Sequence, residues 1–484
     1  MPDPEIDLLA INRGTVAAPA GCGKTHLIAD ALKRHNAAKP ILALTHTNAG
    51  VAALRGRLDK AGVPSRAYRL ATLDGWAMRL IGTFPARSGV DPAVLKLNNP
   101  GKDYPAIRQA AWTLLSGSHV ADILSASFSR LIVDEYQDCN FAQHAMMTWV
   151  AQTLPTCVLG DPMQAIFGWQ GVKMPDWDTD VCKYFSLAGE LQTPWRWTNA
   201  GTEKFGRWLL DVRHALRDGR PVDLRGAPPE VTWIHLDGSE DRVRQLRAAG
   251  VRPADKDGSV LIIGNSKSPP SQRDFAAQIR GAITVESVDL RDTVDFARRL
   301  DFGRSDALDQ VVNFAGNVMT NVGAADLLKR VDILERGTGR REASEAEQAA
   351  LRFKTSPSPA NAIALLSELS KQGGVGTHRP TILRAAISAL QSCDASDPAS
   401  FYESAVRARE QNRLLGRPLP KRAVGSTLLL KGLEADTSVI LNAADLEARD
   451  LYVAMTRGSK RLVVCSGTPV LTRSPRSYKF APFH

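Results

Sequence analysis

The stretch that most constrains the fold is APAGCGKT at residues 18–25, which follows the apolar run GTVAA and precedes a helical pattern. Glycines at positions 21 and 23 allow backbone N–H groups to turn inward, and the N-terminus of the following helix favours anions. In such a loop the Lys24 ammonium reaches terminal phosphates and the Thr25 hydroxyl ligates magnesium. The stretch is therefore typical of a phosphate-binding loop, although Ala18 stands where the general pattern has glycine.

An acidic pair follows another apolar run, in RLIVDEYQD at residues 130–138. A strand there would deliver Asp134 and Glu135 at its carboxyl end, where ligands bind in open parallel sheets. Asp134 could then hold magnesium, and Glu135 could orient or deprotonate an attacking water. An acidic pair after a strand is also common as a solvated turn. Its position downstream of a phosphate loop is what favours the functional interpretation.

Apolar runs of strand length recur in two groups, separated by amphipathic stretches. The first group lies at residues 14–18, 39–45, 129–135 and 155–160, and the second at residues 258–265, 436–443 and 459–467. Between residues 290 and 415 helical patterns replace the strand signal. The sequence therefore predicts an α/β protein with two parallel-sheet lobes and a mostly helical insertion in the second.

The composition fits a globular protein with a polyanionic partner. Lys and Arg outnumber Asp and Glu by 61 to 51, which gives a formal charge of +10. Such an excess favours nucleic acid, because phosphate neutralisation releases counterions, although a basic surface without that role is the alternative. No apolar run approaches a membrane span and no signal peptide is evident, so a cytoplasmic protein is expected. The six cysteines show no C-x-x-C spacing and are interpreted as reduced thiols.

Further motifs occur in a fixed order, and with them the chain resembles the UvrD/Rep/PcrA group of superfamily 1 helicases. The motifs are ALTHTNAGVAALRGRL (43–58), ATLDGWAMRL (71–80), LGDPMQAIFGWQG (159–171), LQTPWRWTN (191–199), STLLLKGLEAD (426–436) and EARDLYVAMTRGSK (447–460). The resemblance implies two RecA-like lobes that bind ATP and Mg²⁺, with reduced accessory insertions. It also implies a DNA-dependent ATPase.

The resemblance assigns candidate residues to the nucleotide site. Gln164 would sense the γ-phosphate and water, while Arg196 and Arg457 would act as arginine fingers beside the catalytic Lys24 and Glu135. Trp195 would stack on the base and Glu434 would contact the ribose. The rest of the nucleotide set is the phosphate loop itself, Ala18, Pro19, Ala20, Gly21, Cys22, Gly23, Lys24 and Thr25, with Thr25 and Asp134 as metal ligands.

The resemblance also implies a DNA-binding set at the loop ends of the first lobe. Phe167 and Trp169 would stack on bases without reading their identity. Short polar groups would bind the sugar–phosphate backbone. Thr and Asn residues cap helices equally often, so each is weighed against that structural role. The polar set comprises Thr45, His46, Thr47, Asn48 and Thr72.

The motif order predicts the domain boundaries. Residues 1–80 and 129–190 would form the first lobe, with a reduced insertion at 81–128. Residues 191–290 and 416–470 would form the second lobe, with a helical insertion at 291–415 and a basic tail at 471–484.

Three departures from the family pattern bear on this interpretation. The first glutamine of the chain is Gln109, so no adenine-reading glutamine precedes the phosphate loop, and use of GTP stays open. Asp74 and Leu428 stand where the family commonly has histidines that contact DNA or couple it to ATP. The coupling between DNA and ATP could therefore be altered.

The leading hypothesis is ATP-dependent translocation on single-stranded DNA with duplex unwinding, in the 3′-to-5′ direction, in DNA repair or anti-phage defence. Its expected partners are single-stranded and tailed duplex DNA. Some short relatives are encoded beside a nuclease, so the second hypothesis is a nucleotide-gated regulatory subunit of a nuclease complex. A passive single-strand binder is the third, and the intact Lys24, Asp134 and Arg457 argue against it.

Overall fold

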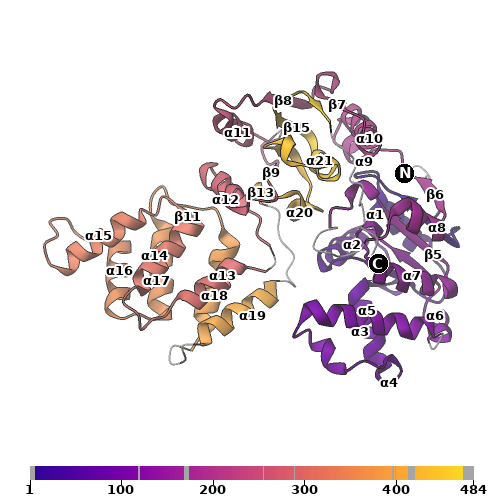
Figure 1. The fold of residues 1–484 in the computed structure, drawn as a ribbon, viewed down its shortest axis with the longest axis horizontal. Helices are drawn as coiled ribbons and strands as arrows, with labels where there is room; N and C mark the ends of the chain where they lie inside the picture. The colour runs from indigo at the N-terminus through magenta and orange to yellow at the C-terminus, as the bar shows by residue number, and fades with distance from the viewer. Residues whose placement is uncertain are drawn as a thin grey trace, which may run out of the picture. The chain divides into compact units, whose positions relative to one another are not determined.

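The computed structural model describes residues 6–117, 120–167, 174–253, 255–287, 289–394, 397, 399–412 and 420–472. Contacts divide the chain into two compact units (Figure 1). The first unit comprises Met1–Val231, Leu446–Lys460 and Val470–His484, and the second comprises Thr232–Asp445 and Arg461–Pro469.

The first unit is built on a parallel six-stranded sheet in the order β3-β2-β4-β5-β1-β6. Its strands are β1 (Arg13–Ala17), β2 (Ile41–Thr45), β3 (Tyr68–Thr72), β4 (Arg130–Val133), β5 (Thr156–Gly160) and β6 (Leu187–Glu190). A separate antiparallel pair joins β7 (Val222–Asp223) to β16 (Val470–Leu471). Because the strands are parallel, the loops after β1, β2, β3, β4 and β5 leave from one edge of the sheet.

Helices cover both faces of this sheet, which explains the unbroken apolar runs of its strands. Leu42 and Leu44 of β2 pack into one core cluster, and Ile41 packs into another. The helices are α1 (Lys24–Arg34), α2 (Asn48–Lys60), α3 (Leu73–Thr83), α4 (Pro85–Ser88), α5 (Pro100–Ser116), α6 (Ala121–Ser127), α7 (Phe141–Thr153), α8 (Cys182–Tyr184), α9 (Trp195–Asn199), α10 (Glu203–Arg217) and α21 (Ala448–Met455).

The second unit contains another six-stranded sheet, in the order β10-β13-β9-β14-β15-β8. Its strands are β8 (Val231–His235), β9 (Val260–Ile263), β10 (Ile283–Thr284), β13 (Arg422–Gly425), β14 (Ala435–Ile440) and β15 (Gly458–Ser466). The pairings β10–β13, β13–β9 and β9–β14 are parallel. Helices α11 (Asp241–Ala249), α12 (Pro269–Gln278) and α20 (Thr427–Leu430) accompany the sheet.

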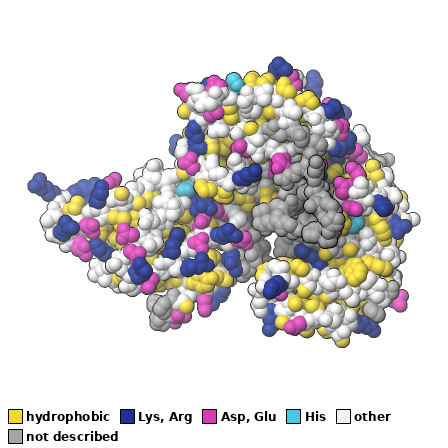
Figure 2. Space-filling model, viewed as in Figure 1, with side chains coloured by type: hydrophobic (Ala, Val, Ile, Leu, Met, Phe, Trp, Pro, Cys, Tyr) yellow, Lys and Arg dark blue, Asp and Glu magenta, His cyan; other side chains and the backbone are white. Residues whose placement is uncertain are grey.

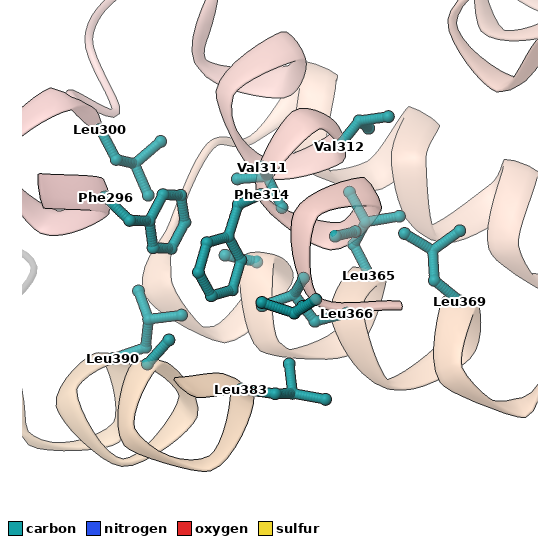
Figure 3. Close-up of a cluster of buried hydrophobic side chains, with 14 of the residues drawn as sticks. Phe296, Leu300, Val311, Val312, Phe314, Leu365, Leu366, Leu369, Leu383 and Leu390 are labelled. Carbon is teal, nitrogen blue, oxygen red and sulfur yellow. The ribbon is translucent and has the colours of Figure 1, made fainter. Parts of the chain in front are cut away.

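Seven helices of the second unit form what we call the helical body, residues 291–412. They are α13 (Arg291–Arg299), α14 (Ala307–Val318), α15 (Ala324–Glu335), α16 (Glu345–Thr355), α17 (Pro359–Lys371), α18 (Pro380–Ser392) and α19 (Ser400–Asn412), with a short antiparallel pair of β11 (Met319–Thr320) and β12 (Gly376–Thr377). Figure 3 shows part of its leucine-rich core, where the Phe296 and Phe314 rings stack with centroids 4.0 Å apart.

The predicted fold class is confirmed: two parallel sheets are wrapped by helices, and the insertions are mostly helical. The contacts group α9, α10 and residues 446–460 with the first unit. The domain boundaries from the motif order stay a prediction, and the tail beyond residue 472 lies outside the described residues. Among the described residues, no helix has the length and apolar character needed to cross a bilayer.

Candidate active site

The phosphate-loop sequence lies where β1 ends and α1 begins. Gly21 and Gly23 adopt left-handed backbone angles, with φ of 72° and 86°, which L side chains rarely adopt. Gly23 precedes α1 and provides no side-chain cap, so the first N–H groups of the helix face the loop without a capping oxygen. The Ala18 N–H donates to Gly160 O at 2.8 Å and holds the start of the loop against β5. This geometry suits an anion at the helix N-terminus.

Lys24 lies between the two acidic residues that follow β4. Its Nζ is 2.8 Å from Asp134 Oδ1 and 2.5 Å from Glu135 Oε1. Burial lowers the pKa of Lys24, but the two carboxylates outweigh burial and raise it overall. Burial raises the pKa of Asp134, against the opposing effect of Lys24. The three candidate groups are thus brought together, with the lysine charged.

Glu135 sits in a strained backbone conformation, with φ of 55°. A non-glycine residue there costs about 1–3 kcal/mol, and such strain is concentrated at functional sites. Its Oε2 accepts a hydrogen bond from Gln137 Nε2 at 2.5 Å, and its backbone N–H donates to Asp134 Oδ1 at 2.9 Å. The Glu135 carboxylate is therefore held from two sides, by Lys24 and by Gln137.

A hydrogen-bonded chain links this acidic pair to Gln164. Gln137 Oε1 accepts the Asp161 N–H at 3.1 Å, and Asp161 Oδ2 accepts from Gln164 Nε2 at 3.0 Å. Asp161 follows β5 and also caps the short 3₁₀ helix Pro162–Gln164. The Gln164 side chain is thus hydrogen-bonded to a buried carboxylate.

Helix α9 packs directly on the phosphate loop. A Cβ added at Gly21 would lie 2.5 Å from Trp197 Cζ3, and one at Gly23 would lie 2.9 Å from Trp195 Cδ1. The Arg196 N–H donates to Gly21 O at 3.0 Å. Glycine is therefore required at both positions by close packing as well as by backbone angle. Trp195 lies beside Gly23 of the loop, and its stacking on a base stays a prediction.

Arg196 and Arg457 meet at the end of α21. Arg196 Nη1 donates to Thr456 O at 2.6 Å, and Arg457 Nη2 donates to Thr456 Oγ1 at 2.9 Å. Arg457 is 3% exposed, and its Nε donates to Val453 O at 2.8 Å. Through α9, which contacts Gly21, both candidate fingers belong to the same packed region as the phosphate loop.

Tyr452 of α21 contacts the loop itself. Its hydroxyl accepts the Ala20 N–H at 3.1 Å. Burial raises the pKa of Tyr452 well above its usual value, so the hydroxyl stays neutral at ordinary pH. Helix α21 also packs against α10 and the Pro162–Gln164 turn. The phosphate loop, the Gln164 turn and α21 therefore form one contiguous structure.

The predicted metal ligands are oxygen donors of the kind that Mg²⁺ prefers, a threonine hydroxyl and a carboxylate. Thr25 Oγ1 accepts a hydrogen bond from Arg57 Nη1 at 2.7 Å, and Asp134 pairs with Lys24. Both oxygens interact with cationic side chains in this structure, and Mg²⁺ would compete with these side chains for them. The donor set therefore fits Mg²⁺ held by Thr25 and Asp134.

The predicted DNA-contact residues lie at or after the carboxyl ends of β2, β3 and β5, at the same edge of the sheet. Thr47 and Thr72 cap α2 and α3, accepting the N–H groups of Gly50 and Gly75 at 3.0 Å. Thr45 is buried at 1% exposure, whereas Asn48 is exposed. The capping role weighed from the sequence is thus present at two positions.

Two aromatic rings of the predicted DNA set lie together. The His46 and Phe167 rings have centroids 5.7 Å apart and are tilted by 43°. His46 follows β2 and Phe167 follows the Gln164 turn, so two separate motifs meet at this point. Trp169 lies outside the described residues.

The structure shows the surroundings of Asp74 and Leu428, two residues that depart from the family pattern. Arg108 of α5 pairs with Asp74 of α3 at 2.6 Å, and Gln143 donates to the same carboxylate at 3.0 Å. Asp74 therefore joins three helices. In the second unit Leu428 is half-buried in α20, and Glu434 is exposed before β14.

The sequence motifs did not single out several residues that contribute to this region. Gln137 and Asp161 lie inside the quoted motifs, two positions after Glu135 and three before Gln164. Tyr452 and Thr456 lie five positions and one position before Arg457 in the last motif. Arg213, which pairs with Asp161 at 2.9 Å, carries no local signal, because it is one of many arginines on helical patterns.

Comparison with known proteins adds one family match. No curated protein sequence matches the chain. Among solved structures, one similar chain is arterivirus nonstructural protein 10, a helicase in complex with DNA. It is 12% identical, with a TM-score of 0.27, over 52% of this chain and 47% of that one. The protein thus spans about half the length of that chain.

Residues 94–177 match the model of the UvrD/REP helicase N-terminal domain. The matched segment contains Asp134, Glu135, Asp161 and Gln164, the residues joined by the hydrogen-bonded chain described above. With this match and the order of its motifs, the chain resembles the UvrD-like superfamily 1 helicases.

Proposed function

We propose that the protein hydrolyses a nucleoside triphosphate, expected to be ATP with Mg²⁺, and uses the energy to move 3′ to 5′ along single-stranded DNA and separate duplex. The observation that carries the proposal is the path from Lys24 through Glu135, Gln137 and Asp161 to Gln164. Beyond its end, Phe167 packs against His46. One short segment after β5 thus links the phosphate site to the candidate DNA contacts.

The pairing of Lys24 suggests how nucleotide entry is sensed. A triphosphate in the loop would compete with the carboxylates for the Lys24 ammonium. Glu135 would lose its contact with Lys24 and keep its contact with Gln137. Its carboxylate would then be able to accept a proton from a water molecule. When bound, Mg²⁺ would neutralise part of the phosphate charge.

The arginines would supply the remaining charge stabilisation. A guanidinium stays charged even when buried and can grip phosphate oxygens in a bidentate manner. Arg196 and Arg457 are held by Thr456 beside a helix that contacts Gly21. In this proposal each guanidinium exchanges a backbone or hydroxyl oxygen of Thr456 for a phosphate oxygen.

The candidate DNA surface is expected to bind without sequence preference. Aromatic stacking and short polar contacts to the backbone do not identify the base. On the face drawn in Figure 2, Lys and Arg side chains are interspersed with Asp and Glu rather than gathered in one field. Binding should therefore depend on positioned contacts as well as on the net charge of +10.

The decisive experiment measures nucleotide turnover with single-stranded DNA of graded length, using ATP and GTP in parallel. A translocating motor gives turnover that rises with strand length and then saturates. Turnover that is independent of length would instead support the regulatory-subunit hypothesis. Unwinding is then compared on duplexes with a 3′ or a 5′ tail, and faster separation of the 3′-tailed duplex is expected. A preference for the 5′ tail would contradict the proposed direction.

A matched variant separates binding from chemistry. Glu135→Gln removes the proton-accepting carboxylate while keeping its size and its ability to pair with Gln137. Nucleotide binding should persist while turnover falls by at least about 100-fold. If Glu135→Gln hydrolyses nucleotide at the wild-type rate, Glu135 is not the group that activates water.

A further inference from the structure

Helix α10 carries a buried cation that the nucleotide chemistry does not require directly. Arg213 is 2% exposed and is one of the largest fully buried side chains among the described residues. Its Nε donates to Asp161 Oδ1 at 2.9 Å, and its Nη1 donates to Glu190 Oε1 at 2.5 Å. A buried charge is costly unless it is paired and hydrogen-bonded, so this arrangement is held by its two carboxylates.

The partner of Arg213 is the carboxylate that orients Gln164. Asp161 Oδ1 accepts from Arg213 and from the Met163 N–H at 3.1 Å, while Oδ2 accepts from Gln164 Nε2 at 3.0 Å. The Asp161 side chain is 1% exposed, so water cannot readily replace a lost partner. With both oxygens engaged, the carboxylate has a single orientation, and that orientation fixes the Gln164 amide.

Burial also explains why arginine is suited to this position. A guanidinium presents donors in a planar fork, so one side chain can bind Asp161 after β5 and Glu190 at the end of β6. Burial lowers the pKa of Arg213, but the neighbouring carboxylates outweigh it and raise the pKa overall. Lysine would keep the charge but would not reproduce the two directed bonds.

We propose that Arg213 is a positioning residue that holds Asp161 and, through it, fixes the Gln164 amide for nucleotide hydrolysis. The inference rests on the proposed function, because Gln164 acts in hydrolysis only if the chain hydrolyses a nucleoside triphosphate. It concerns a residue of α10 that lies outside every sequence motif quoted above. Arg213 itself does not contact the phosphate loop residue Lys24, which pairs with Asp134 and Glu135.

This role makes a specific kinetic prediction. Arg213→Met leaves Asp161 buried without its cation, and Arg213→Lys keeps a cation without the forked geometry. Both should lower DNA-stimulated kcat by roughly 10- to 100-fold, because a misplaced catalytic group costs that much. The dissociation constant for ATP should stay within about twofold of wild type, since the phosphate loop is intact. Asp161→Asn should reproduce the loss of kcat.

A matched control lies on the same helix. Arg207 of α10 pairs with Glu203 one turn away, and both side chains are exposed, at 66% and 48%. Arg207→Met removes an arginine from α10 without touching Asp161, so it should leave kcat unchanged. A purely structural role for Arg213 would lower the melting temperature of the variants but leave kcat per folded molecule at the wild-type value.

The test uses the full-length chain with ATP and single-stranded DNA, and it monitors folding by circular dichroism. If Arg213→Met does not fold, Arg213→Lys decides the question. If the wild-type chain turns over ATP and Arg213→Lys has the same kcat, this inference is overturned and the proposed function stands. Absence of turnover in the wild-type chain would overturn the proposed function and this inference with it.

Discussion

Two arginines, one in each unit, are buried and paired with carboxylates in the same way, but we expect them to have different roles. The Arg213 and Arg379 side chains are each 2% exposed, and each pairs with two carboxylates. Arg213 joins α10 to Asp161 after β5 and to Glu190 of β6. Arg379, which precedes α18, joins Glu286 after β10 to Asp292 of α13.

The difference lies in what the carboxylates do next. Asp161 accepts a hydrogen bond from the Gln164 amide, in the candidate active site. Glu286 and Asp292 lie where the polypeptide passes from the sheet of the second unit into the helical body, and Asp292 also pairs with Arg273 of α12 at 2.8 Å. A buried ion pair is weak evidence for stability on its own, so its role must be inferred from its neighbours. We therefore expect rate effects at Arg213 and stability effects at Arg379.

The largest effect should come from the phosphate loop. Lys24→Ala removes the ammonium that would meet the phosphates and leaves Asp134 and Glu135 facing each other without a cation. Turnover should fall by about a thousand-fold or more. Steady-state ATPase assays measure it, with binding of a fluorescent ATP analogue as a second readout. Substantial residual turnover would mean that Lys24 is only a structural partner of the acidic pair.

Removing the arginine of the second unit should cost stability rather than rate. Arg379→Met removes the cation that pairs with Glu286, which is 8% exposed, and breaking such a buried pair costs about 3–5 kcal/mol. Hydrogen–deuterium exchange should show faster exchange in α13 and α18, while nucleotide turnover of the folded fraction is retained. Arg298→Met, which breaks an exposed pair with Asp295 on α13, is the control and should change neither.

His378 gives the same region a pH dependence. Burial, with Arg379 and Arg273 nearby, lowers the pKa of His378 from 6.5 to about 4. The unfolded state therefore binds a proton at higher pH than the folded state. The contribution of neutral His378 to stability is fully present above pH 6.5 and is lost as pH falls toward about 4, by about 3 kcal/mol.

The measurement compares urea denaturation of wild type and His378→Gln across this pH range. The difference between the two isolates the histidine from the carboxylates that titrate nearby. A constant difference in stability from neutral to acidic pH would show that His378 is not buried in its neutral form.

The smallest effect is expected at Glu190, the second partner of Arg213. Its side chain is 25% exposed, and Glu190→Gln keeps an oxygen to accept from Arg213 Nη1. Stability should change by less than about 1 kcal/mol and kcat by less than about threefold. ATPase and thermal denaturation assays test this. A loss of kcat as large as that of Asp161→Asn would show that both carboxylates, and not Asp161 in particular, position the site.

Much of the fold could be predicted because its signals are local. Fully buried strands such as β2, ILALT, appear as continuous apolar runs. The glycines at 21 and 23 indicate a turn with positive φ, which other residues rarely adopt. The pairing of Lys24 with Asp134 and Glu135 follows from two motifs after β1 and β4, strands of one parallel sheet that are separated only by β5. The assignments of the motif residues to ATP and DNA stay predictions.

Other features depend on contacts that no local pattern reports. In the sequence, Trp197 cannot be distinguished from any other core aromatic residue. In the structure, its ring is what excludes a Cβ at Gly21. The grouping of residues 446–460 with the first unit depends on α21 packing against α10 and the Gln164 turn, segments hundreds of residues away. Sequence spacing could not predict either contact.

By itself the sequence determined the chemistry that is available: a glycine-rich loop ending in Lys24 and Thr25, an acidic pair after a strand, and apolar runs that must be buried on both faces of a sheet. Only the tertiary structure decided which charges meet. Arg213 and Arg379 are indistinguishable from surface arginines along the chain, and each became a buried cation because folding brought two distant carboxylates to it. Burial makes such pairing obligatory, and burial is a property of the packed chain rather than of any one segment.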